Sequence, residues 1–421
     1  MKKIFAKLLG TLAMALIFAG CAQAPHANIE LPPIPEHGGI GVRVISATEW
    51  FAYHPDIVAS YLRNYDNYHK YCYLELNPYM RILYEGFGFA VMYNSPRGHV
   101  FSMESTDMTE RPRLRANCFA CKSANYAAVR EYMGIAFYST PFDDLRHVMT
   151  QPVSCFNCHG NDPSQGPRPM AQYVHDALGI HFGEVSMASL SCAQCHVEYH
   201  FDQNTWEIIL PYRSLADMYP TNMLAWFNNQ GREHSYDGGP FADWVNPRSG
   251  VRQIKVQHPE FETVYGRGGV HNSLAPVGMA FSCADCHMPT EVNAQGVPYR
   301  SHEWMSPLRN MRLIEGTCSA CHGDLAAEVQ SIQVRYMLEI HELGNHLAVL
   351  MERLVLAVNA GTDEGLLDEI RENFRSAQFM WDFVMMENSN GAHNSRLLFR
   401  TIQYGWGYAY KVEALLNQVG F

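Results

Sequence analysis

Ten of the twelve cysteines fall into five Cys-x-x-Cys pairs, and this pattern limits the possible folds more than any other feature of the sequence. Zinc is one common use of such pairs. A histidine follows the second cysteine at once in four of the five, however, and only 20 of the 421 residues are histidine. Cys-x-x-Cys-His is the pattern of covalent c-type haem attachment. We therefore predict five covalently attached haem c groups, bound by Cys118 and Cys121, Cys155, Cys158 and His159, Cys192, Cys195 and His196, Cys283, Cys286 and His287, and Cys318, Cys321 and His322.

The first of these motifs differs from the others, because it reads Cys118-Phe-Ala-Cys121-Lys122. The residue after the second cysteine lies against one face of the iron. Histidine in that place usually goes with a second histidine on the other face, which gives a closed iron that only carries electrons. Lys122 instead indicates an iron left open for a substrate. Cys72 lies outside all five motifs, and we predict a buried, inert thiol there.

The amino-terminus reads as an export signal. Three lysines precede an apolar run from Leu8 to Ala19 that is too short to span a membrane. The run ends in Phe18-Ala19-Gly20-Cys21, a bacterial lipoprotein pattern, so we predict a signal over residues 1–21 and a membrane tether through lipid on Cys21. An incidental cysteine near an ordinary cleavage site is the alternative. Residues 22–45 are rich in Pro, Gly and Ala and predict a flexible linker. The mature protein is expected to be periplasmic or otherwise extracytoplasmic.

Net charge excludes one class of partner. Removal of residues 1–20 takes away three lysines and leaves 31 − 3 = 28 basic residues against 42 acidic ones, a net charge of −14. Nucleic acid is therefore not an expected partner. An anionic substrate would need a local positive funnel.

The chain pattern predicts a mainly α fold with extensive loops and very little sheet. All five motifs lie within residues 46–323, where Gly, Pro, Asn and aromatic spacers favour short helices and long loops around the haems. Residues 324–421 are expected to form a carboxy-terminal helical region that serves dimerisation. A long amphipathic helix, a second helix to about Glu387 and a third from about Ser395 to Gln418 are expected there. The first helix has an apolar stripe, which suits either packing within the chain or self-association: Ile332, Tyr336, Ile340, Leu343, Leu347, Leu350 and Leu354.

Two further clusters complete a family pattern. The lysine motif, the four histidine motifs, Glu198-Tyr199 and Lys255-x-Gln257-His258-Pro259-Glu260 occur in this order. Together they closely resemble the pentahaem cytochrome c nitrite reductases that form ammonium, over roughly Glu49 to the carboxy-terminus. The resemblance implies a multihaem cytochrome c fold with a carboxy-terminal long-helix bundle. It implies six-electron reduction of nitrite at a Lys-ligated open haem fed by four bis-His haems. It also implies a homodimer through the long helices, and a membrane quinol dehydrogenase cytochrome or a soluble multihaem cytochrome as electron donor.

The resemblance also implies roles for single residues. Lys122 corresponds to the proximal ligand, and Tyr199 and His258 to distal groups that donate hydrogen bonds and protons, histidine being able to change charge near neutral pH. The distal arginine is Arg111, with Arg113 as the alternative because the loop after His99 is short. The distal haem ligands, numbered by motif in chain order, are His302 for the second haem, His99 for the third, His393 for the fourth and His271 for the fifth. One calcium ion is held by the Glu198 side chain, the Tyr199 and Lys255 carbonyls and the Gln257 side chain.

Two other functions stay open at this point. A pure electron-transfer conduit would need all five irons closed, and low-spin spectra would reveal it. An open-haem reductase acting mainly on hydroxylamine or sulfite would differ only in comparative kinetics.

Overall fold

The computed structural model describes residues 43–421, except 236–237, 270 and 273–280. The predicted signal, the lipid site at Cys21 and most of the linker lie outside the described residues. The last residues of the linker range are described, and Val44 and Ile45 are buried there. The domain boundaries given above stay predictions.

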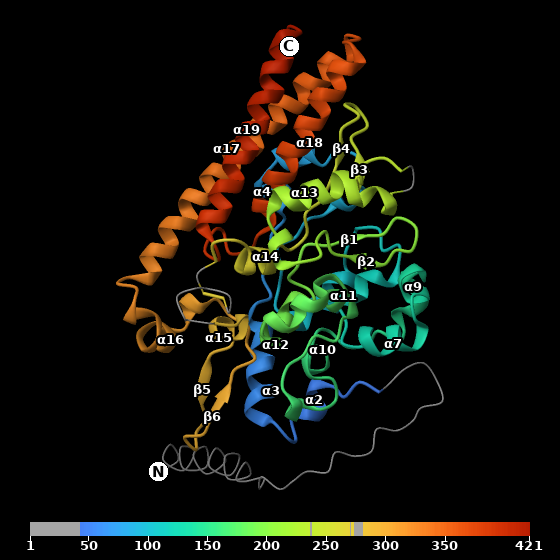
Figure 1. Cartoon of the computed structure of the whole chain (residues 1–421). Helices are drawn as coiled ribbons and strands as arrows, with labels where there is room; N and C mark the ends of the chain where they lie inside the picture. The colour runs from blue at the N-terminus through green and yellow to red at the C-terminus, as the bar shows by residue number, and fades with distance from the viewer. Residues whose placement is uncertain (1–42, 236–237, 270, 273–280) are drawn as a thin grey trace, which may run out of the picture. The chain divides into compact units, whose positions relative to one another are not determined.

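Short helices and loops make up the region that carries the five motifs (Figure 1). Its α-helices are α2 (Ala47–Trp50), α3 (Pro55–Leu62), α4 (Tyr73–Leu76), α5 (Tyr79–Leu83), α6 (Ser102–Asp107), α7 (Tyr126–Met133), α8 (Ala136–Ser139), α9 (Phe142–Arg146), α10 (Cys155–His159), α11 (Gln172–Leu178), α12 (Met187–Ala193), α13 (Pro220–Asn229), α14 (Glu260–Tyr265), α15 (Cys283–His287) and α16 (Met311–Gly316). The named strands pair as antiparallel two-stranded ribbons: β1 (His200–Phe201) with β2 (Ile208–Ile209), β3 (Trp244–Val245) with β4 (Arg252–Gln253), and β5 (Thr290–Val292) with β6 (Pro298–Arg300). The predicted fold class is confirmed, since little of the structure is sheet.

Helical turns shape the haem motifs. The second and fourth motifs coincide with α10 and α15, and the first ends the 3-10 helix η5 (Ala116–Cys121). Residues three and four apart lie on the same face of a helix, so a helical turn brings both thiols and the following side chain together. Ser282 caps α15, because its hydroxyl accepts from Asp285 N while the Asp285 carboxylate accepts from Ser282 N at 2.8 Å.

Three long helices form the carboxy-terminal region and pack against one another (Figure 1): α17 (Leu325–Asn359), α18 (Glu364–Met386) and α19 (Ser395–Gln418). These are the three helices expected from the sequence. Each begins after a side chain that accepts a backbone N–H of the first turn, namely Asp324, Asp363 and Asn394. A close approach at Gly344 joins α17 to α5, because a Cβ there would lie 2.4 Å from the Tyr79 ring.

Two other features bear on the predictions. Cys72 is half-buried rather than buried, and its backbone forms a bridge with Asn94. Within the described ranges, none of the helices combines the length and the apolar character needed to cross a membrane.

Candidate active site

Four pairs of imidazole rings lie opposite one another in the motif region, with their planes tilted or nearly perpendicular. The ring centres are 6.3 Å apart for His159 and His302, 6.2 Å for His196 and His99, 6.1 Å for His287 and His393, and 6.1 Å for His322 and His271. In each pair a motif histidine meets the distant histidine that the resemblance gave for the same haem. Two metal–nitrogen bonds of about 2 Å, plus the distance from each nitrogen to its ring centre, add up to roughly 6 Å. The residues present therefore fit one metal between the two rings of each pair.

In four of these histidines, Nδ1 lies within hydrogen-bond distance of a carbonyl or carboxylate oxygen of the protein. His302 Nδ1 lies 3.0 Å from the Arg300 carbonyl and His287 Nδ1 lies 2.9 Å from the Met305 carbonyl. His322 Nδ1 lies 2.8 Å from Glu328, and His393 Nδ1 lies 2.6 Å from Glu387. When Nδ1 donates to such an acceptor, Nε2 is the nitrogen left for a metal. This is the tautomer that a haem ligand needs.

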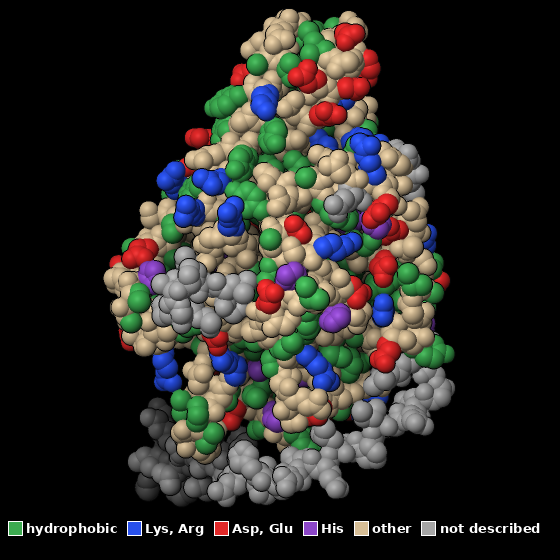
Figure 2. Space-filling view, in the orientation of Figure 1, with side chains coloured by type: hydrophobic (Ala, Val, Ile, Leu, Met, Phe, Trp, Pro, Cys, Tyr) green, Lys and Arg blue, Asp and Glu red, His purple; other side chains and the backbone are tan. Residues whose placement is uncertain are grey.

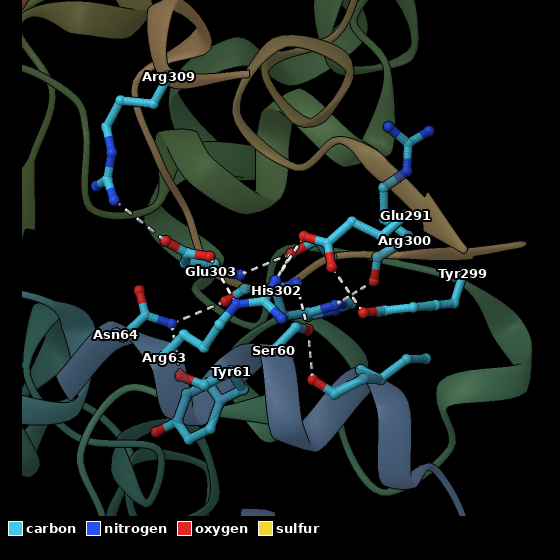
Figure 3. A network of polar contacts seen from close by, with 12 residues as sticks. Ser60, Tyr61, Arg63, Asn64, Glu291, Tyr299, Arg300, His302, Glu303 and Arg309 are labelled. Carbon is cyan, nitrogen blue, oxygen red and sulfur yellow. Dashed lines mark hydrogen bonds and ion pairs between the residues drawn. The ribbon is translucent and has the colours of Figure 1, made fainter. Parts of the chain in front are cut away.

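A polar network from α3 and the following turn holds His302 in place (Figure 3). His302 N donates to Ser60 Oγ at 2.8 Å, and Asn64 Nδ2 donates to the His302 carbonyl at 2.8 Å. Arg63 Nε donates to the next residue, Glu303, at 2.7 Å. These contacts could not be predicted from the sequence. Each of them links residues well over 200 positions apart, so no local pattern announces them.

The lysine motif lies beside two arginines. The Arg111 guanidinium lies 4.3 Å from the Tyr93 ring centre, and its charge reaches the Cys118 thiol. Arg113 lies 5.3 Å from the Phe142 ring centre instead. The Lys122 carbonyl accepts from Ser102 Oγ at 2.7 Å, which fixes the backbone after the second motif cysteine.

Tyr199 and His258 lie close to the same motif. Burial raises the pKa of Tyr199 well above its usual value, and the Cys121 and Cys118 thiols raise it further. Burial also lowers the pKa of His258 to about 4, and the charge of Lys122 acts in the same direction. His258 Nδ1 is buried without a hydrogen-bond partner. With these pKa values both side chains are neutral near neutral pH and can donate hydrogen bonds.

Two buried carboxylates meet next to the distal residues. Glu198 Oε2 accepts from Gln257 N at 2.6 Å, whereas Glu198 Oε1 is buried with no partner. Glu262 Oε1 accepts from Glu198 N at 3.0 Å and from Tyr212 OH at 2.8 Å, and Glu262 Oε2 has no partner. Burial raises the pKa of Glu198 well above its usual range and that of Glu262 to about 8. Glu262 belongs to no motif in the sequence and was not among the predicted site residues.

These oxygens fit a hard cation. The Lys255 carbonyl is also in reach, since Gln257 Nε2 lies 3.3 Å from it. Unpartnered carboxylate oxygens beside amide and carbonyl oxygens are the ligands that calcium takes. In the part of the chain that the structure describes, three or more His, Cys, Asp or Glu side chains do not converge on one point. A cation here would accordingly depend on backbone and amide oxygens as well as on Glu198.

Comparisons with known proteins give a consistent answer. The family model for cytochrome c552 matches residues 49–421. A cytochrome c-552 from Desulfotalea psychrophila is 26% identical over 424 aligned residues, which cover 94% of this chain and 80% of the relative. A cytochrome c-552 from Bacteroides fragilis is 27% identical over 367 residues, which cover 82% of this chain and 70% of the relative.

One solved structure adds the fold. The catalytic subunit of cytochrome c nitrite reductase from Desulfovibrio desulfuricans superimposes with a TM-score of 0.77 and 26% identity, covering 88% of this chain and 86% of its own. That protein has two calcium sites. The match to the family model runs from the start of the folded part to the last residue, and it confirms the resemblance predicted from the motifs. The chain therefore belongs to the cytochrome c552 family.

Proposed function

We propose that the protein reduces nitrite to ammonium with six electrons. The observation that carries the proposal is Lys122 in the place of a motif histidine, with Arg111, Tyr199 and His258 gathered near it. The other four motifs each have a paired imidazole. The solved relative from Desulfovibrio desulfuricans is a cytochrome c nitrite reductase.

Each distal residue has a task that its chemistry supports. When bound, the haem at Cys118 and Cys121 would supply an iron with one open face, and the other four haems would deliver electrons singly. Lys122 would hold that haem through its side-chain nitrogen. The planar fork of Arg111 suits an anion with two oxygens, and the action of its charge on Cys118 favours it over Arg113 for this role. Tyr199 and His258 donate hydrogen bonds and pass protons to the bound anion.

The cation site supports the same arrangement. We propose one calcium ion held by Glu198, the Tyr199 and Lys255 carbonyls and Gln257. The unpartnered oxygens of Glu198 and Glu262 support this, because two buried carboxylates side by side are costly without a positive charge. Glu198 immediately precedes Tyr199, and Gln257 immediately precedes His258. A calcium ion bound there would therefore hold the backbone of both donors in place.

The paired histidines are proposed as the ligands of the second to fifth haems, with His302, His99, His393 and His271 on the distal faces. Such closed irons carry electrons, and we propose a membrane quinol dehydrogenase cytochrome or a soluble multihaem cytochrome as their donor. The protein would act outside the cytoplasm, tethered by lipid on Cys21.

A homodimer through α17 is part of the proposal. Several large apolar side chains on this helix are more than half exposed: Val334, Leu338, Val349 and Leu356. A shallow groove runs along the helix between Ala327 and Glu342 and contains the first two of them. Figure 2 shows hydrophobic side chains along the carboxy-terminal helices and acidic ones at their tip. The substitution Leu338→Glu should convert the dimer to a monomer in light scattering, and an unchanged mass would reject this surface.

The catalytic proposal is tested with the haem-loaded protein and a reduced dye. Nitrite should be consumed with formation of an equal amount of ammonium. His258→Asn should lower kcat/KM by roughly 100-fold or more, because a positioned proton donor typically contributes that much. His175→Asn, on an exposed part of α11, is the matched control and should leave the rate unchanged. Normal turnover in His258→Asn would reject its role, and purely low-spin spectra without cyanide binding would reject the open iron.

A further inference from the structure

Helix α18 binds an extended backbone segment through three polar side chains on one face. Arg375 Nη1 donates to the Arg252 carbonyl at 2.8 Å, and Gln378 Nε2 donates to the Ile254 carbonyl at 2.8 Å. Asp382 Oδ2 accepts from Val256 N at 2.9 Å. The three side chains are three and four residues apart on one face of the helix, and their partners are every second residue of the extended segment. They therefore bind the same edge of residues 252–256. We call these three side chains the α18 clamp.

Asp382, the last residue of the α18 clamp, also forms a fully buried ion pair with Lys255. Lys255 Nζ lies 2.9 Å from both Asp382 oxygens, and the two side chains are 1% and 0% exposed. Tyr84 OH also donates to Asp382. The Asp382 carboxylate thus accepts from the Lys255 ammonium, from a backbone N–H and from a phenol.

Both halves of the distal site are connected to this carboxylate. His258 follows Val256 by two residues, so the bond from Val256 N to Asp382 fixes the backbone just before it. On the other side, Lys255 Nζ lies 5.2 Å from the Tyr93 ring centre, and the Arg111 guanidinium lies 4.3 Å from the same ring centre.

A gain in stability is a poor explanation for such a pair. Removing two charges from water costs about as much as their attraction returns, so an apolar pair of similar volume is often equally stable or more so. The geometry favours a role in positioning, because the ion pair contacts both the backbone that leads to His258 and the Tyr93 ring.

We propose that Asp382 is a positioning residue for the distal site, which sets the places of His258 and Arg111 without touching the substrate. It does so through the Val256 N–H and the Lys255 ammonium, and it ties the site to the carboxy-terminal helices. The inference deepens the proposed function, but anion binding at the open haem can test it without turnover.

The variants are chosen so that a failure to fold does not decide the outcome. Asp382→Asn alone would leave the Lys255 charge buried and unpaired. The double variant Asp382→Asn with Lys255→Met removes both charges at once. Gln378→Met weakens the α18 clamp one step earlier and leaves the ion pair intact. The matched control is Arg248→Met with Glu352→Gln, a half-exposed pair that also joins a C-terminal helix to this part of the chain.

The measurement is the dissociation constant of cyanide, and then of nitrite, at the ferric open haem, read from the optical spectrum at full haem content. The double variant and Gln378→Met should each bind at least about tenfold more weakly, since a misplacement of about 1 Å can cost roughly 100-fold in the rate of a positioned reaction. The control should stay within about twofold of the wild type. Unchanged affinities in Gln378→Met or in the double variant, or an equal loss in the control, would overturn the inference. If cyanide affinity shifts but the wild type makes no ammonium, the proposed function fails and the positioning role stands.

Discussion

A buried carboxylate beside His393 should lower the potential of the proposed fourth haem. Glu387 is 1% exposed, and its Oε1 lies 2.6 Å from His393 Nδ1. An acceptor of this kind makes the ring a more basic ligand and stabilises the ferric state. Glu387→Gln keeps the shape of the side chain and removes the charge, so the potential of this haem should rise.

The size of the shift follows from the geometry. Across the imidazole and a metal–nitrogen bond of about 2 Å, the carboxylate lies roughly 6.5 Å from the metal. At an effective dielectric constant of about 20 the lost attraction is about 2.6 kcal/mol. A tenfold change in a one-electron equilibrium corresponds to about 59 mV, so the potential should rise by roughly 100 mV.

The chain offers a matched control at the proposed fifth haem. Glu328 accepts from His322 Nδ1 at 2.8 Å, but its side chain is 49% exposed. Water screens that charge, and at a dielectric constant near 80 the same estimate gives only about a quarter of the shift. Glu328→Gln should therefore change its haem by roughly 30 mV.

Redox titration followed by optical and paramagnetic resonance spectra resolves the single haems. The expected result is one low-spin haem moved upward in Glu387→Gln, with the others nearly constant. Equal shifts in the two variants would refute the reasoning, because burial would then not govern the effect. A shift below about 20 mV in Glu387→Gln would refute the carboxylate's role altogether.

Three further predictions follow from other parts of the structure. Glu198→Gln should weaken calcium binding at least about tenfold in calorimetry of the chelator-treated holoprotein, and an unchanged affinity would move the site elsewhere. Gly344→Ala should lower the free energy of unfolding by about 2 kcal/mol, because the new methyl would lie 2.4 Å from the Tyr79 ring, whereas Gly407→Ala in α19 meets nothing within 4 Å and should not destabilise. Burial lowers the pKa of His200 to about 3. Between pH about 6.5 and 3 the ring is therefore neutral in the native protein but protonated in the unfolded chain. Stability from this group is present above pH about 6.5 and falls by up to about 1.4 kcal/mol per unit as pH drops toward 3, a slope that His200→Phe should remove in acid unfolding.

Local patterns in the sequence were enough for the helices. The apolar stripe from Ile332 to Leu354 lies within α17, and its repeat of three and four arises from contacts along a single helix. Asp324 extends that helix to Leu325 by capping its first turn, a boundary that the stripe alone could not show. The helix expected from about Ser395 to Gln418 is found between these residues, and Asn394 caps its first turn.

The site could be predicted only as far as its motifs reach. The residues alone gave no reason to choose His302 over the other histidines, and the choice came from the resemblance. Glu262 and Asp382 escaped notice because their partners are distant in the chain: Asp382 meets Val256 across 126 positions. One signal was present, however. A carboxylate between Trp381 and Phe383, on the buried face of an amphipathic helix, requires a partner that the helix itself does not provide.

The four imidazole pairs have a consequence for how the chain comes apart. If a metal joins each pair, His99 is tied to His196, His159 to His302 and His287 to His393, and each of these closed loops overlaps the next. A cross-link that closes a loop of about 100 residues removes roughly 4.7 kcal/mol of chain entropy from the unfolded state. Because the loops overlap, residues 99–393 cannot separate fully into an extended chain while these links hold. Complete unfolding of this region should then be limited by the lifetime of the metal–imidazole bonds.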